Sequence, residues 1–195
     1  MTPLRRHTLV WLAAPPRTAI PADQSAADAW HARGLPFVVT RQSAGEPGVG
    51  LGFCLPEAGH RSRRVAARCC EESVLRAEPP PLLGRVAGVF AETAAAANAL
   101  APLSPRIFGS WMWRFLEGGP HTRSGSDLDL LVAVSGRAEA ERAVLALQEA
   151  EGVSALRLDG ELSFPCGEVA WREYAGRPAQ ILLKTLTDVR LVPFA

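Results

Sequence analysis

Residues 127–134, Asp-Leu-Asp-Leu-Leu-Val-Ala-Val, place two aspartates one residue apart in an otherwise apolar run. An apolar run of this length predicts a β-strand, and alternate side chains of a strand share a face. Asp127 and Asp129 therefore project from one face, while Leu128 and Leu130 point from the other face toward a core. Because the Cα atoms of the two aspartates lie about 7 Å apart by strand rise, their carboxylates can converge on one cation.

Two such carboxylates repel each other, and the repulsion raises the pKa of one of them. Mg²⁺ removes this cost, because it prefers a few carboxylates together with phosphate oxygens. The structural alternative, in which the acids cap turns or meet arginines, is the commoner explanation of an isolated Asp-x-Asp. The residues before the strand favour the metal, and we expect Asp127 and Asp129 to bind Mg²⁺ and to be catalytic.

Those preceding residues contain a candidate phosphate site. Residues 105–109 predict a short strand, and residues 110–117 predict a helix that ends at two glycines. Gly109, at the junction, lets the backbone approach a ligand closely, and the first N–H groups of a helix favour phosphate. The Ser110 hydroxyl can cap the helix or bond a phosphate oxygen. Gly109 and Ser110 are therefore candidate substrate-binding residues.

The hydrophobic pattern predicts two domains joined near residues 79–81, three prolines that cannot continue a helix or a central strand. Residues 1–80 predict a smaller α+β domain, and residues 81–195 predict an α/β (α+β) domain with a mixed sheet and helices on one side. In the first domain, strands are predicted at 7–14, 36–42 and 49–56 and a helix at 21–34. In the second, helices are predicted at 82–101 and 137–152, a hairpin turning at Asp159 and Gly160 within 153–164, and strands at 168–175 and 179–186.

Composition narrows the partners and the compartment. The chain has 195 residues, of which 48% are hydrophobic, and a net charge of +1, so no global positive field attracts nucleic acid. No apolar run reaches the roughly 18 to 20 residues that span a bilayer. The four cysteines include no Cys-x-x-Cys pair. We therefore expect reduced, mostly buried thiols in a cytoplasmic protein that binds neither nucleic acid nor membrane.

The order of strand, Gly-Ser, helix, loop, Ser-Asp-x-Asp and apolar run over residues 105–134 resembles the polymerase-β-type nucleotidyltransferase superfamily. The loop between Ser110 and Asp127 is longer than in many minimal members. A narrower resemblance covers nearly the whole chain and is to the MdcG-type family of malonate decarboxylase holo-acyl-carrier-protein synthases, or phosphoribosyl-dephospho-CoA transferases. The segments that resemble this family are RRHTLVWL, LPFVVTRQ, FGSWMWRFLEGGPHTRSGSDLDLLV, LDGELSFPCGEVAWREYAGR and ILLKTLTDVRLV.

The resemblance implies a substrate and a partner, and it implies that the domain at residues 1–80 binds substrate or carrier and that the domain at residues 81–195 is catalytic. Members of that family join 2′-(5″-triphosphoribosyl)-3′-dephospho-CoA to a serine of the apo acyl-carrier subunit of malonate decarboxylase and release pyrophosphate. The chemistry agrees with the residue pattern, because two carboxylates that bind a metal support attack on a phosphorus with pyrophosphate as the leaving group.

The superfamily resemblance also implies a third carboxylate from a neighbouring strand, for which the candidates are Glu161 and Asp159. The predicted hairpin favours Glu161, because Asp159 would lie in the turn and Glu161 would begin the returning strand, on the same face as Ser163. Asp127 and Asp129 would then bind Mg²⁺, and Glu161 would accept the proton of the carrier serine. Asp159, or neither residue, is the alternative.

Basic residues supply candidate contacts to the donor. Lys184 interrupts an apolar predicted strand, where it either meets the triphosphate or faces water from an edge strand. The cluster that contains Arg61 and Arg64 either binds phosphates or the acidic carrier, or is a solvated basic face. Trp111 and Trp113 predict core packing, with stacking on adenine as the alternative.

Two other functions compete with this one. A small-molecule adenylyltransferase that uses ATP would share the catalytic residues, but it leaves the N-terminal half without a purpose. A non-catalytic carrier-binding module of the same fold is the second alternative, and the intact Ser110, Asp127 and Asp129 argue against it.

Overall fold

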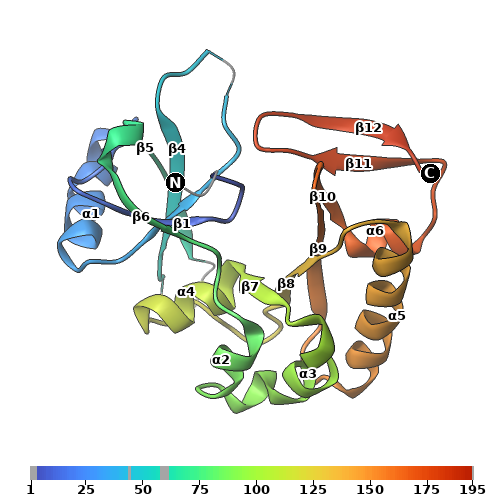
Figure 1. Ribbon diagram of the computed structural model, residues 1–195. Coiled ribbons are helices and arrows are strands. Elements are labelled where there is room, and N and C mark those ends of the chain that lie inside the picture. Colours follow the sequence, from blue (N-terminus) through green and yellow to red (C-terminus); the bar gives the residue numbers. More distant parts are fainter. Residues whose placement is uncertain (1–3, 44, 58–61, 195) are drawn as a thin grey trace.

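The computed structural model describes residues 4–43, 45–57 and 62–194, which form two six-stranded sheets surrounded by helices (Figure 1). The N-terminal sheet has the order β2-β5-β4-β3-β1-β6, and each of its strand pairs is antiparallel. Its strands are β1 (Leu9–Leu12), β2 (Arg17–Thr18), β3 (Phe37–Val39), β4 (Val49–Leu55), β5 (Arg63–Cys69) and β6 (Val74–Glu78). Helix α1 (Pro21–Ala32) and the short 3₁₀ helix η1 (Glu71–Ser73) complete this part.

Trp30 connects α1 to both halves of the core. Its side chain is buried, and its indole N–H donates a hydrogen bond of 2.9 Å to the Pro36 carbonyl, which satisfies the polar end of the ring. The ring lies 5.1 Å from that of Phe53 on β4 and 5.5 Å from that of Trp113 in the C-terminal part. The two parts therefore share buried aromatic contacts.

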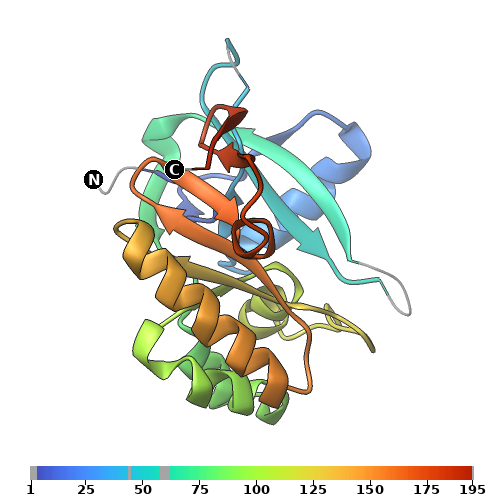
Figure 2. The same cartoon turned by 90° about the vertical axis from the view of Figure 1, so that its right-hand side faces the viewer.

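The C-terminal sheet has the order β12-β11-β10-β9-β8-β7, and β8 and β9 are the one parallel pair among the described strands. Its strands are β7 (Arg106–Phe108), β8 (Leu128–Ala133), β9 (Leu158–Phe164), β10 (Gly167–Ala170), β11 (Gln180–Lys184) and β12 (Val189–Pro193). The helices are α2 (Leu83–Ala87), α3 (Ala94–Ala99), α4 (Gly109–Glu117), α5 (Arg137–Val153) and α6 (Trp171–Ala175), with 3₁₀ helices η2 (Ala91–Thr93) and η3 (Ala101–Leu103). Figure 2 shows α5, which connects β8 to β9, lying along this sheet. The predicted mixed α+β class is confirmed.

The hairpin predicted at Asp159 and Gly160 is wrong, because β9 runs through both residues without a turn. Gly160 is needed for another reason. A Cβ at this position would collide with the backbone of Leu130 on the neighbouring strand, so glycine permits close approach of the two strands. The hairpin turn lies instead at residues 165–166, between β9 and β10.

Two further predictions about local structure are corrected. The strand predicted at 168–175 ends at Ala170, and α6 follows, with Trp171 and Tyr174 buried. The helical pattern of 82–101 is divided among α2, η2, α3 and the start of η3. An eight-residue stretch of alternating apolar residues suits both a strand and a strand followed by one helical turn, so the pattern alone could not separate them.

Three other expectations concern burial and the membrane. Trp111 and Trp113 are buried, which confirms the core interpretation and leaves no room for stacking on adenine. All four cysteines are free thiols, but Cys54 and Cys69 are only half-buried and Cys70 and Cys166 are exposed, so the expectation of mostly buried thiols is wrong. Within the described residues, no helix is both long enough and apolar enough to cross a membrane.

Candidate active site

The site is built on the edge where β8 and β9 begin. Asp127 immediately precedes β8 and Asp129 lies within it; both are half-buried, whereas Leu128 and Leu130 between and after them are buried. The predicted alternation of faces is therefore confirmed. In the parallel register, Asp129 is the partner of Asp159 on β9, so their side chains project from the same face. Three aspartates thus share one face of two adjacent strands.

These carboxylates act on one another electrostatically. Burial, first, and the negative charges of Asp159 and Asp127 together raise the pKa of Asp129 to about 6, although the charge of Arg64 acts to lower it. Arg157 partly neutralises the group, because one guanidinium nitrogen lies 2.5 Å from Asp127 Oδ2 and 3.5 Å from Asp159 Oδ2. The Arg157 side chain is 54% exposed, so it can leave the carboxylates without disturbing the core.

Gly109 brings the start of α4 against this group. Its φ is 67°, and a Cβ at this position would overlap the Asp129 carboxylate. Only glycine therefore allows the backbone to come this close. The expected cap at Ser110 is wrong, because α4 begins at Gly109 with Phe108 at the cap position and no side-chain cap bond. Among the described residues the Ser110 hydroxyl makes no hydrogen bond, so it is available to a ligand.

The three aspartates fit a hard divalent cation in their chemistry, because carboxylate oxygens are the ligands that Mg²⁺ prefers. In the described part of the chain, no three His, Cys, Asp or Glu side chains are placed closely enough together to hold a metal ion. Arg157 explains the spacing, since it lies between Asp127 and Asp159 where a cation would neutralise the same charges.

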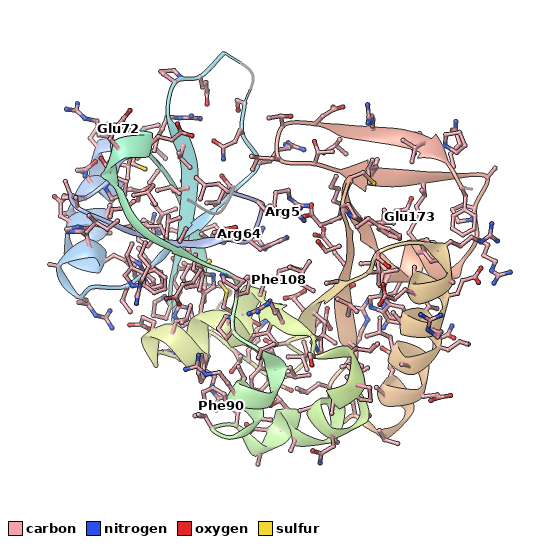
Figure 3. The ribbon with its side chains drawn as sticks, in the orientation of Figure 1. Arg5, Arg64, Glu72, Phe90, Phe108 and Glu173 are labelled. Atoms are coloured by element: carbon pink, nitrogen blue, oxygen red, sulfur yellow. The ribbon has the colours of Figure 1, made fainter. Side chains whose placement is uncertain are left out.

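Arg64 reaches this face from the N-terminal sheet. It lies on β5, its side chain is exposed, and its positive charge acts on Asp129. Figure 3 labels both Arg64 and Phe108, the residue of β7 that pairs with Asp129. Arg61, the other predicted member of the basic cluster, lies outside the described residues.

Glu161 occupies a different environment from the aspartates. Arg6, His7 and Lys184 each contact its carboxylate, at 3.2, 3.1 and 2.8 Å. Burial would raise the pKa of Glu161, but hydrogen bonds from His7 and Lys184 and the charge of Arg6 hold it well below its usual range. A carboxylate that binds protons so weakly is a poor general base. The structure therefore favours Asp159 over Glu161 as the third carboxylate of the site.

Lys184 lies on β11, which pairs with β10 on one side and β12 on the other. The alternative that placed Lys184 on an edge strand is therefore wrong. Its ammonium group pairs with Glu161, and its side chain is 27% exposed, so its contact with the triphosphate remains a prediction.

The family follows from comparison with known proteins. A family model described as phosphoribosyl-dephospho-CoA transferase MdcG C-terminal domain matches residues 74–195, and one described as the MdcG N-terminal domain matches residues 5–80. The chain belongs to the MdcG family. As a member of this family it is a transferase. No solved structure matches it.

The relatives of this MdcG family member are similar over nearly their whole length. A protein of Xanthomonas campestris pv. campestris (strain 8004), named phosphoribosyl-dephospho-CoA transferase, is 38% identical over 96% of this chain and 93% of its own. Proteins with the same name from Xanthomonas euvesicatoria pv. vesicatoria (strain 85-10) and Bradyrhizobium diazoefficiens are 39% and 30% identical, each over 97% of this chain, and over 94% and 90% of their own.

Several residues at the site were not identified from the sequence of this family member. Arg157 directly precedes the strand that carries Asp159. The feature that could have identified Arg157 is a basic residue two positions before an acidic one. Arg6 and His7 contact Glu161, from which they are separated by 155 and 154 residues. No local pattern links positions so far apart.

Proposed function

We propose that this chain transfers the phosphoribosyl-dephospho-CoA group of 2′-(5″-triphosphoribosyl)-3′-dephospho-CoA to a serine of the apo acyl-carrier subunit of malonate decarboxylase, with release of pyrophosphate. The observation that supports the proposal best is the group of three aspartates on β8 and β9 beside the start of α4. Carboxylates next to helix N–H groups suit a reaction at a phosphate. The names of the relatives agree with the transferred group.

The donor would bind through its phosphates. Asp127 and Asp129 would hold Mg²⁺, which would supply Lewis-acid stabilisation of the charge that develops on the phosphate oxygens. The first backbone N–H groups of α4 and the Ser110 hydroxyl would bind other phosphate oxygens. Arg64 and Lys184 would supply positive charge for a polyanionic donor.

The acceptor would be a serine hydroxyl of the carrier. Its oxygen attacks the α-phosphorus of the donor, the new O–P bond forms, and the bond to pyrophosphate breaks. The hydroxyl proton passes to the Asp159 carboxylate, which lies beside Asp129 and is not locked into the ion pairs that surround Glu161. Asp159 thus takes the role of general base.

Mass spectrometry of the intact carrier tests this proposal. We expect wild-type enzyme, Mg²⁺ and the triphosphoribosyl donor to add one phosphoribosyl-dephospho-CoA group to the carrier and to release one equivalent of pyrophosphate. A carrier in which the acceptor serine is alanine is the control and should stay unmodified. A carrier that gains mass only when ATP replaces the donor would contradict the proposed substrate.

A further inference from the structure

Three hydrogen-bonded side chains lie outside the aspartate site, at the other end of α4. Ser62 Oγ lies 3.0 Å from His121 Nδ1, and His121 Nε2 lies 3.0 Å from Glu117 Oε2. Glu117 also accepts a hydrogen bond of 2.8 Å from the Gly119 N–H and pairs with Arg33 at 2.7 Å. We call Ser62, His121 and Glu117 the relay. It connects the residue before β5 to the C-terminal end of α4.

Burial fixes the direction of the hydrogen bonds in the relay. The His121 side chain has no exposed surface, and burial lowers its pKa although Glu117 raises it, so the imidazole is neutral at pH 7. Burial raises the pKa of Glu117, but hydrogen bonds from Arg33 and His121 hold it below its ordinary value, so the carboxylate only accepts. Nε2 of His121 therefore carries the proton and donates to Glu117. Nδ1 is left to accept a hydrogen bond from the Ser62 hydroxyl.

Arg64 lies two residues after Ser62, at the start of β5. In the described part of the chain Arg64 has no acidic partner within ion-pair distance, and its positive charge acts on Asp129. Its neighbour Arg63 pairs with Asp23, and alternate residues of a strand point to opposite faces. Arg64 is thus the arginine at this end of β5 that is left for a ligand.

Helix α4 connects the aspartate site to the relay. Its first residue, Gly109, touches the Asp129 carboxylate, and its last residue, Glu117, belongs to the relay. A guanidinium binds phosphate with fixed planar geometry, so its strand must be held in place relative to the phosphate. The relay supplies such a connection, because it fastens the start of β5 to the same helix that borders the aspartates.

We propose that Ser62, His121 and Glu117 are positioning residues, which hold β5 so that Arg64 contacts a phosphate of the donor beside Asp129. This inference rests on the proposed function, because it assigns Arg64 to the donor. The relay itself touches no substrate.

Removal of the Ser62 hydroxyl tests the inference with little risk to the fold. We expect Ser62→Ala to weaken donor binding about five-fold, the effect of one hydrogen bond, and to speed deuterium exchange of amides in residues 62–66. Ser62→Thr keeps the hydroxyl and should restore both values. Arg68→Ala is the matched control, because Arg68 lies on the same strand but pairs with Glu46. It should leave donor affinity unchanged.

A double-mutant cycle separates positioning from general loosening. If Ser62 acts through Arg64, then Ser62→Ala should add no further loss of donor affinity in an Arg64→Ala background. Additive losses, or unchanged exchange and affinity in Ser62→Ala, would overturn the inference while the proposed function stands. Covalent labelling of Ser62 by an organophosphonate would also overturn it, since Ser62 would then be a nucleophile. Failure of the wild-type protein to bind the donor in calorimetry would overturn both the proposed function and the phosphate contact of Arg64. Deuterium exchange in Ser62→Ala would then test only whether the relay holds β5 in place.

Discussion

Asp129 on β8 and Asp159 on β9 are direct partners in a parallel strand pair, and their carboxylates project from the same face. The sheet therefore holds two negative charges next to each other, with Asp127 as a third nearby. Such an arrangement costs free energy in the absence of a cation or a basic ligand.

Asp129→Asn should stabilise the metal-free protein at pH 8 and abolish transfer. The folded-state pKa of Asp129 is about 6, above its ordinary value of 3.8, so the folded state binds this proton more tightly than the unfolded state. The ionised form is thus penalised in the folded protein above pH 6, and the penalty disappears as pH falls toward 4. Since one pKa unit is about 1.4 kcal/mol and part of the effect is screened by solvent, we expect a gain of about 1 to 2 kcal/mol.

Urea unfolding of both proteins between pH 4 and pH 8, in chelator, measures this difference. The gain should be largest at pH 8 and close to zero near pH 4. A gain that stays constant over this range would contradict the assignment of the raised pKa to Asp129.

Gly109→Ala should remove activity, whereas Ser110→Ala should only weaken donor binding. A Cβ at Gly109 would overlap the Asp129 carboxylate at a positive φ, so the alanine displaces either the helix start or the aspartate. We expect Gly109→Ala to cost about 1 kcal/mol or more of stability. Ser110 is not the helix cap, so its replacement should leave the melting temperature unchanged. Calorimetry with the donor and thermal unfolding give both values, and a Ser110→Ala variant with normal donor affinity would leave this hydroxyl without a function.

Arg64→Glu should raise the KM for the donor and leave kcat at saturation nearly unchanged, because the contact serves binding. The increase in KM should shrink with added salt, since exposed charges are screened over about 10 Å at 0.1 M ionic strength. Steady-state rates at several salt concentrations test this. A loss confined to kcat would instead place Arg64 among the groups that act in the transition state.

Part of this structure could be predicted from local sequence. The alternation in residues 127–134 predicted which side chains of β8 face the core, and the glycines after α4 predicted its end at Glu117. The hairpin at Asp159 and Gly160 could not be ruled out, because Asp-Gly favours a turn locally. Only the neighbouring strand reveals why glycine is needed there, namely its approach to the backbone of Leu130.

Contacts between segments that are far apart in the sequence could not be predicted from local patterns either. The surroundings of Glu161 are set by Arg6 and His7, which come from the start of the chain. Because local sequence does not reveal that contact, the predicted hairpin placed Glu161 at the start of a returning strand and favoured it as the base. The relay is similar, because Ser62 and His121 are 59 residues apart and neither lies in a recognisable motif.

The single-turnover rate of carrier modification by Asp159→Asn, compared with that of Glu161→Gln, tests the central claim most directly. Asp159→Asn should fold normally and react at least about 100-fold more slowly than wild type, the usual effect of losing a general base. Glu161→Gln should react within about five-fold of wild type wherever it is folded, but it should lose about 3 kcal/mol of stability, because Arg6 and Lys184 lose a buried partner. An active Asp159→Asn together with a folded but inactive Glu161→Gln would contradict the account and move the catalytic carboxylate two residues along β9.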